Sequence, residues 1–359
     1  MKKFAIHQFL PCWGNSAKTC SEIFEPFVIR MILLFIFCFF LFPFSSSHAQ
    51  QLQQYSQYIL NDFVLNPAIA GSQDYYELKL NGRYQWVGIP GSPKTFTLSM
   101  NMPHKKKNVG LGGYIYCDDA GPFTRTGINF AYAYHIHFSE DPERSGVKLS
   151  LGLFGGLMQY KIDGSEIILA HEEEETFIYD KKQSVIVPDV TMGFYLYSDR
   201  FFIGLSSYQI FHNNIRLLDN EFPEDNLGKL ANHIFITGGC RFKIKEDFKI
   251  EPSILIKSLG TNEFIFISGF SSPIPLQYDL SARFFYQDQV WLGFSYRTYD
   301  ALSVLLGYEY KEYIYFGYSY DFTTSNLKKY SSGSHEVMIG YRFGKLKEEQ
   351  TSDINKSLF

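Results

Sequence analysis

Beyond its first 49 residues the sequence lacks any hydrophobic run long enough to cross a membrane as a helix. The one long run, Met31–Phe44, ends in a serine cluster before Ala49, which is typical of a secretory signal peptide with small residues at its cleavage site. A membrane helix needs ~20 apolar residues. We therefore predict a signal peptide over residues 1–49, with Met31 as an alternative translation start.

Cysteine and a strong charge of one sign are also missing. Of five cysteines, only Cys117 and Cys240 follow the signal peptide, and they lie far apart, so we expect no disulfide framework. The formal net charge of −4 gives no reason to expect a nucleic-acid partner. Aromatic residues, by contrast, make up 18% of the chain, and they favour pleated sheet and membrane interfaces.

Catalytic and cofactor motifs are absent. The sequence has no phosphate-binding loop, dinucleotide fingerprint, G-x-S-x-G or H-E-x-x-H motif. The acidic run His171–Glu175 lacks the spacing of an EF-hand, and His135 and His137 share a strand face without a third ligand. In Gly110–Pro122 glycines alternate with apolar residues, so we expect small residues facing lumen or lipid. We expect no enzyme, metal or cofactor.

From Tyr76 onward, fourteen segments alternate between apolar and polar side chains, as strands do. The predicted strands are residues 76–86, 95–102, 109–117, 128–138, 147–153, 187–197, 201–211, 233–242, 248–257, 278–286, 290–298, 302–310, 313–321 and 335–343. Every even-numbered connection is short, and the long connections are all odd-numbered. This asymmetry is typical of outer-membrane barrels. We predict an all-β, antiparallel transmembrane β-barrel of about 14 strands over residues 76–344.

One face of these strands is apolar, and the other carries charges of both signs. We expect the charges to pair inside a lumen that is narrow or plugged, and the apolar face to contact lipid. The candidate lumen-lining charges are Glu77, Lys79, Arg83, Lys148, Glu251, Lys257, Asp279, Arg283, Arg297, Glu309, Glu336 and Arg342. We predict that Ser331–Gly344 closes the barrel against the first strand, and that its aromatic end, Tyr341 and Phe343, resembles the signal read by the barrel-insertion machinery.

The segment before the first strand, residues 50–75, is too polar and irregular to be a barrel strand. It either plugs the lumen or hangs in the periplasm as a docking arm, and its aromatic residues favour the plug. The candidate plug or docking residues are Tyr55, Tyr58, Phe63, Asn66, Pro67 and Gly71. An even strand number places residue 50 and the tail, residues 345–359, on one side. We predict that this side is the periplasm and that the long loops face outward.

Several stretches resemble the PorP/SprF family of type IX secretion system membrane proteins of Bacteroidota. These stretches are Gln53–Ser72 with its Asn66-Pro67-Ala68-x-Ala70-Gly71 core, Arg83–Thr95, Gly110–Pro122, Glu251–Lys257, Asp279–Arg297 and Gly317–Phe343. The resemblance implies a Gram-negative outer-membrane barrel that helps to export or anchor cargo with type IX C-terminal domains, including gliding adhesins. It also implies two partners, a periplasmic peptidoglycan-binding protein and the secretion motor. The sequence departs from the family in residues 162–186 and 260–275.

Two alternatives to a secretion-system barrel remain at this point. An outer-membrane porin or transporter for small solutes would show the same strand pattern and loop asymmetry. A secreted β-sandwich would also show alternation, although not the sorting of long and short connections.

Overall fold

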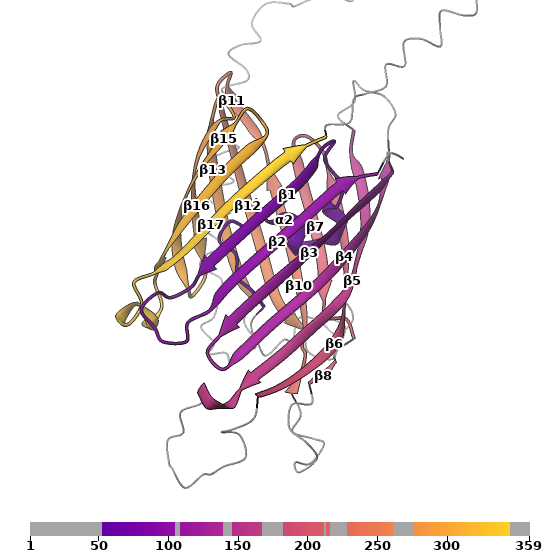
Figure 1. Cartoon of the computed structure of the whole chain (residues 1–359). Helices are drawn as coiled ribbons and strands as arrows, with labels where there is room; N and C mark the ends of the chain where they lie inside the picture. The colour runs from indigo at the N-terminus through magenta and orange to yellow at the C-terminus, as the bar shows by residue number, and fades with distance from the viewer. Residues whose placement is uncertain are drawn as a thin grey trace, which may run out of the picture. The chain divides into compact units, whose positions relative to one another are not determined.

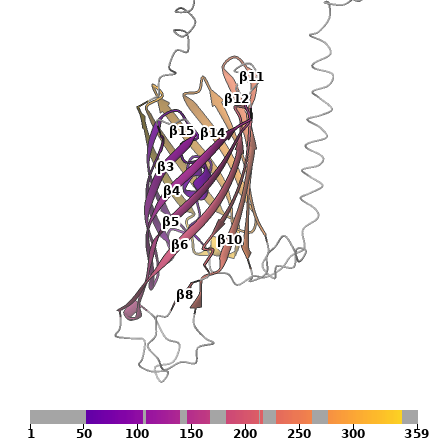
Figure 2. The same cartoon turned by 90° about the vertical axis from the view of Figure 1, so that its right-hand side faces the viewer.

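The computed structural model describes residues 52–104, 108–138, 146–166, 182–211, 213–215, 228–260 and 276–344. These residues form a closed antiparallel barrel of fourteen strands (Figures 1 and 2). The predicted signal peptide, the acidic run His171–Glu175 and the tail lie outside the described residues. No helix in the described part of the chain is long and apolar enough to cross a membrane.

The barrel strands follow one another around the ring in chain order. They are β1 Tyr76–Tyr84, β2 Lys94–Pro103, β3 Val109–Ala120, β4 Phe123–His137, β5 Lys148–Asp163, β6 Lys182–Tyr197, β7 Phe201–Tyr208, β10 Asn232–Cys240, β11 Phe242–Lys245, β12 Phe248–Gly260, β13 Gln277–Tyr286, β14 Val290–Arg297, β15 Ala301–Tyr310, β16 Ile314–Thr323 and β17 Ser334–Phe343. A short pair, β8 Asn214–Ile215 and β9 Gly228–Lys229, lies between β7 and β10. Both β10 and β11 pair with β12, so they occupy one place in the ring. Near the break between them stands Pro252 of β12, which has no N–H to donate.

The ring closes between β1 and β17. Their register runs from Tyr76 opposite Phe343 to Tyr84 opposite His335. The rings of Tyr76 and Phe343 meet edge to face with centroids 5.5 Å apart. The prediction that the last strand pairs with the first is therefore confirmed, while a role of Phe343 in barrel insertion stays a prediction.

Strands β4, β5 and β6 are longer than predicted. β5 was expected to end at residue 153 but continues to Asp163, still paired with both neighbours. The polarity pattern breaks down along this strand, because the apolar side chains of Phe154 and Met158 face the lumen and the polar Gln159 faces outward. A search for alternating apolar residues on the outer face therefore ends the predicted strand too early. Most other predicted strand ends agree to within a few residues.

The two faces of the barrel wall differ in the way expected for a protein surrounded by lipid. Large apolar side chains such as Leu80, Phe130 and Ile339 are exposed outward, while charged residues such as Arg83 and Glu336 are buried inside. This is the reverse of a water-soluble domain. Each position in the described ring also has a paired strand on both sides, which satisfies backbone groups as a sheet surrounded by lipid requires.

The two ends of the barrel differ in their connections. At one end, here called the short-turn end, β11 and β12, β13 and β14, and β15 and β16 are joined by two or three residues. At the other, the long-loop end, lie the connections after β5, β7, β12 and β16. In Figure 1 the short-turn end is uppermost, and β1 begins there. The predicted sorting is present with one exception, because the connection from β4 to β5 at the short-turn end, residues 138–147, is as long as the one from β16 to β17, residues 324–333.

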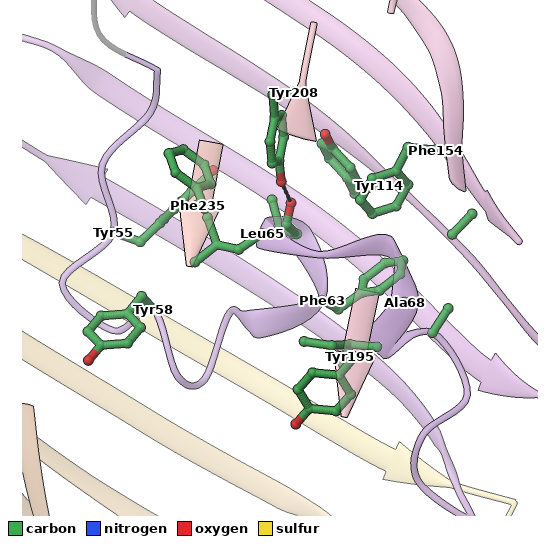
Figure 3. Close-up of a cluster of buried hydrophobic side chains, with 14 of the residues drawn as sticks. Tyr55, Tyr58, Phe63, Leu65, Ala68, Tyr114, Phe154, Tyr195, Tyr208 and Phe235 are labelled. Atoms are coloured by element: carbon green, nitrogen blue, oxygen red, sulfur yellow. Dashed lines mark hydrogen bonds between the residues drawn. The ribbon is translucent and has the colours of Figure 1, made fainter. Parts of the chain in front are cut away.

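Residues 52–75 are here called the lumen segment, and they lie inside the barrel as far as Ala70, whereas Gln73 and Asp74 are exposed (Figure 3). The segment contains the single-turn helix α2, Asp62–Leu65, and the 3-10 helix η1, Pro67–Ile69. Gln54 contacts Arg297 near the long-loop end, and the segment leaves at the short-turn end, where β1 begins. This direction runs against the expectation that residue 50 is periplasmic, although residue 50 itself lies outside the described residues.

Candidate functional site: the barrel lumen

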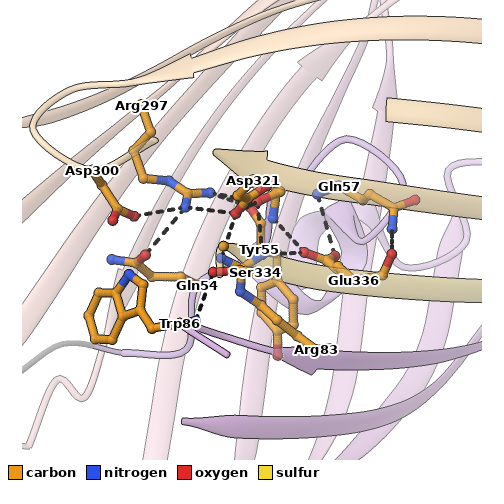
Figure 4. Close-up of polar contacts among 12 residues, drawn as sticks. Gln54, Tyr55, Gln57, Arg83, Trp86, Arg297, Asp300, Asp321, Ser334 and Glu336 are labelled. Atoms are coloured by element: carbon orange, nitrogen blue, oxygen red, sulfur yellow. Dashed lines mark hydrogen bonds and ion pairs between the residues drawn. The ribbon is translucent and has the colours of Figure 1, made fainter. Parts of the chain in front are cut away.

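The lumen segment is held to the closing strand by a buried carboxylate. The backbone N–H of Ser56 donates to Glu336 Oε2 at 2.7 Å, and that of Gln57 donates to Glu336 Oε1 at 3.4 Å. The Gln57 amide donates to the Glu336 carbonyl oxygen at 3.1 Å. Figure 4 shows Glu336 of β17 pointing into the barrel toward the segment. The seam between β1 and β17 and the segment therefore share one buried acid.

Arginines complete this network at the long-loop end. Arg83 Nη1 pairs with Glu336 at 3.0 Å, and its Nη2 pairs with Asp321 at 2.7 Å. Ser56 Oγ donates to Asp321 at 2.6 Å and accepts from Arg83 at 2.9 Å and from Arg297 at 3.1 Å. All of these side chains are nearly inaccessible to solvent. Buried charges of this kind are tolerated only when paired and hydrogen-bonded, so each arginine needs both the wall and the segment.

Glycines of the barrel wall form the seat of η1. A Cβ atom added to Gly110 would lie 1.8 Å from the Ala70 carbonyl oxygen, and one added to Gly152 would lie 2.3 Å from the Ala68 nitrogen. On β6, a Cβ at Gly193 would lie 2.0 Å from Asn66 Oδ1. No side chain fits at these three positions while the segment is in place. The wall and the segment are therefore complementary in shape.

Asn66 organises the turn that rests on these glycines. Its Oδ1 accepts from the Ala68 N–H at 2.9 Å, which caps η1, and Pro67 stands at the first position of that helix. Its Nδ2 donates to the Phe194 carbonyl oxygen of β6 at 2.9 Å. Gly71 then turns the chain with φ +68°, a conformation that favours glycine.

Aromatic residues fill the space between the segment and the barrel wall. The Phe63 ring packs edge-on against Phe154, with centroids 5.4 Å apart. Tyr55 Oη is hydrogen-bonded to Thr97 Oγ1, and Tyr58 Oη to Ser253 Oγ, each at 2.9 Å. Both tyrosines are buried, and their hydroxyl groups are satisfied.

At the short-turn end the segment leaves part of the lumen empty. A cavity of about 320 Å³, here called the vestibule, lies beside the segment and is lined by residues of β1, β6, β7, β10 and β12 to β17. Lys79 Nζ donates to the Leu60 carbonyl oxygen at 2.6 Å and pairs with Asp62 at 3.1 Å and with Glu77 at 3.0 Å. Arg342 joins Glu77 to Glu309 across the neighbouring strands.

The charges proposed from the sequence occupy two groups and one outlying position. Arg83, Lys257, Asp279, Arg297 and Glu336 lie toward the long-loop end, where Lys257 pairs with Asp279 at 3.0 Å. The group at the short-turn end comprises Glu77, Lys79, Glu251, Arg283, Glu309 and Arg342. Lys148 stands apart at the start of β5, 5.9 Å from the centre of the Tyr197 ring. The closing-strand residues Tyr341 and Phe343 stack with centroids 5.3 Å apart.

Some residues of the lumen were missed from the sequence. Asp321 lies on the inward face of β16 together with Tyr315 and Ser319, so the alternation of that strand contained the signal. The seat glycines had no such signal, because glycine fits either face. Their partner, the lumen segment, is distant in sequence.

Neither histidine of the β4 pair forms part of a metal centre in the described residues, where no group of three or more potential ligands occurs. His135 Nε2 is hydrogen-bonded to the Ala70 carbonyl oxygen at 2.8 Å, and its Nδ1 to the Tyr197 hydroxyl at 3.1 Å. His137 is exposed at the strand end. Cys117 and Cys240 are both exposed free thiols.

Comparison with known proteins identifies the family. The family model described as type IX secretion system membrane protein PorP/SprF matches residues 47–341. This chain belongs to the PorP/SprF family. A PorP/SprF barrel with an apolar outer face is an outer-membrane protein of a secretion system.

Solved barrels share little sequence with this PorP/SprF protein. The CymD monoaromatic hydrocarbon channel is 11% identical with a TM-score of 0.46, over 84% of this chain and 95% of that one. A Pseudomonas aeruginosa FadL homologue is 9% identical with a TM-score of 0.38, over 75% and 89%. The Acinetobacter baumannii outer membrane protein Omp33 is 6% identical with a TM-score of 0.38, over 75% and 98%. Among curated proteins no match was found.

Proposed function

We propose that this protein is a plugged, non-enzymatic barrel that supports export or surface anchoring of type IX cargo, such as gliding adhesins. The observation that carries the proposal is the lumen segment itself. It shares the buried acid Glu336 with the barrel seam and rests on glycines that admit no side chain. A lumen built around a polypeptide is suited to holding proteins at the membrane and poorly suited to passing solutes.

The alternative function is a porin or transporter for small solutes, and liposome swelling separates the two. Purified protein in liposomes is expected to give sugar uptake close to that of protein-free liposomes, with an open porin as the positive control. Rapid uptake of sugars at the porin's rate would overturn the plugged barrel in favour of the solute channel.

The family's partners supply the second part of the proposal. We place the short-turn end and the tail, residues 345–359, in the periplasm, within reach of a peptidoglycan-binding protein and the secretion motor. The long-loop end would then face the cargo at the cell surface. Affinity purification in mild detergent is expected to recover those periplasmic proteins together with cargo that carries the type IX C-terminal domain.

Sidedness is tested by labelling single cysteines in protein from which Cys117 and Cys240 have been removed. A cysteine at Glu173, in the acidic loop, is expected to react with an impermeant maleimide in intact cells. Cysteines at Lys106 and Glu348 are expected to react only after the outer membrane is broken. The reverse pattern would invert the barrel and place the short turns beside the cargo.

A further inference from the structure

The vestibule has the dimensions and lining of a binding pocket. Its volume of about 320 Å³ falls at the lower end of the ~300–1,000 Å³ typical of ligand sites. Its rim includes the ion pair between Lys249 and Asp288, whose side chains are 42% and 61% exposed. Its depth is formed by the lumen segment, including Tyr58 and Asn66. The pocket is therefore reached from the short-turn end.

The charged side chains around the pocket form two networks of ion pairs, one with an excess of carboxylates and one with an excess of cations. On one side Asp62, Lys79, Glu77, Arg342 and Glu309 are linked in series, with three carboxylates to two cations. On the other side Glu251 bridges Arg241 and Arg283, with two cations to one carboxylate. The side of β11 to β13 is thus the one that attracts an anionic group.

Arg241 is the member of that cationic network with hydrogen-bonding capacity to spare. Its Nε donates to Glu251 Oε2 at 2.7 Å, while no other side-chain partner occurs for it among the described residues. Its side chain is 44% exposed, and its guanidinium lies 5.8 Å from the centre of the Phe202 ring. A guanidinium held in place with two terminal nitrogens left over matches the fork of a carboxylate.

Aromatic surfaces complete the pocket beside these arginines. Trp291 and Phe285 line it, and the Arg283 guanidinium lies between them, 5.5 Å and 5.1 Å from the two ring centres. Trp291 itself is only 4% exposed, so the half-buried Phe285 is the aromatic surface that remains for a ring on a ligand. The pocket therefore offers one anion contact next to one aromatic contact.

We infer that the vestibule binds an extended peptide segment of a partner protein that carries a carboxylate side chain next to an aromatic one. The carboxylate pairs with the terminal nitrogens of Arg241, and the aromatic ring packs against Phe285, beside the buried Trp291. This inference deepens the proposed function, on which it rests, by naming the kind of segment that docks at the short-turn end.

Tryptophan fluorescence offers a direct test, because the chain has only three tryptophans, Trp13, Trp86 and Trp291. Trp13 belongs to the predicted leader, so mature Trp86→Phe protein reports from Trp291 in the pocket alone. The probes are acetylated and amidated tetrapeptides of sequence Gly-Phe-Asp-Gly, Gly-Phe-Asn-Gly and Gly-Phe-Lys-Gly. The aspartate peptide is expected to change the emission saturably and to bind about tenfold more tightly than the asparagine peptide, as a charged hydrogen bond requires.

Variants of two neighbouring cations separate the pocket from general surface charge. Arg241→Gln is expected to weaken binding of the aspartate peptide about tenfold, while Lys249→Gln at the rim changes it less than about twofold. Equal effects of the two variants, or no saturable change with any peptide, would overturn the inference. Competition by acetate as strong as by the peptide would reduce the site to an adventitious ion only and overturn it as well.

The same preparation distinguishes failure of this inference from failure of the proposed function. Liposomes that exclude sugars while the peptides fail to bind would leave the plugged barrel standing and remove the peptide pocket. Liposomes that admit sugars would remove the proposed function, whatever the peptides do.

Discussion

The two ends of the lumen use the same residue types and reach different results. At the long-loop end Arg83, Arg297 and Glu336 are at most 2% exposed, and the lumen segment contacts all of them. At the short-turn end Arg342 and Glu309 have side chains that are 21% and 22% exposed and line the vestibule. Both ends pair arginine with carboxylate across strands.

The difference lies in what the lumen segment supplies. At the long-loop end its backbone N–H groups and the Ser56 hydroxyl satisfy oxygens that the wall leaves free, so the charges can be sealed from water. At the short-turn end the segment contacts only part of the wall, and the remaining charges stay beside open space. Whether a paired charge is sealed in the structure or available to a ligand thus depends on the lumen segment, which is not one of the barrel strands that carry the pair.

The largest effect that separates the two ends is expected from matched glutamate substitutions. Glu336→Ala leaves Arg83 and two backbone N–H groups buried without their acid, which is expected to cost about 3–5 kcal/mol of unfolding free energy. Glu309→Ala removes a partner from the partly exposed Arg342, which keeps Glu77, and is expected to cost less than about 1 kcal/mol. Urea unfolding from lipid vesicles measures both. Equal losses would show that the ends do not differ in burial.

The next effect compares the outside of β17 with its inside. Ile339 is exposed on the apolar outer face, so Ile339→Arg is expected to cost about 2–4 kcal/mol if it stands near the bilayer midplane. Arg342→Gln on the lumen face is expected to be milder, at about 1 kcal/mol. Folding yield and unfolding in vesicles of fixed thickness provide the measurement. A harmless arginine at Ile339 would contradict the assignment of the two faces.

Two glycines of β5 sharpen the comparison between wall and segment. A methyl group at Gly152 meets the Ala68 backbone at 2.3 Å, whereas one at Gly155 meets nothing within 4 Å. Gly152→Ala is expected to cost about 1–3 kcal/mol through overpacking, and to raise ion conductance in planar bilayers as the segment is displaced. Gly155→Ala serves as the matched control and is expected to leave conductance unchanged. Conductance that rises equally in both variants would argue against the seat.

The smallest effect concerns one hydroxyl of the segment. Tyr55→Phe keeps the packed ring but loses the hydrogen bond to Thr97, which is expected to cost about 1 kcal/mol. Tyr308→Phe, on the exposed outer face, is the control and is expected to change the unfolding free energy very little. If neither substitution changes the free energy of urea unfolding, the hydrogen bond between Tyr55 and Thr97 does not hold the segment in place.

Much of the barrel could be predicted from the sequence because period-two alternation and connection lengths are local properties. The fourteen strands, the closure of β17 on β1 and the outward position of residues such as Ile339 all follow from them. Local reasoning failed where the alternation breaks down, as in β5 from Phe154 onward, since polarity there no longer marks the inside and the outside of the barrel.

The sequence by itself thus determined the barrel wall, since the alternation of polar and apolar residues within each strand marks its inner and outer faces. Only the tertiary structure decided what fills that wall. The contact of Ser56 with Glu336 joins residues 280 positions apart. The space over Gly110 and Gly152 is filled by the lumen segment, and nothing in the local sequence around these glycines indicates that contact. Such contacts depend on ring closure, which brings the N-terminal segment and the last strand together. The sealed end and the open vestibule are consequences of that closure, because the same arginine–carboxylate pairs occur at both ends.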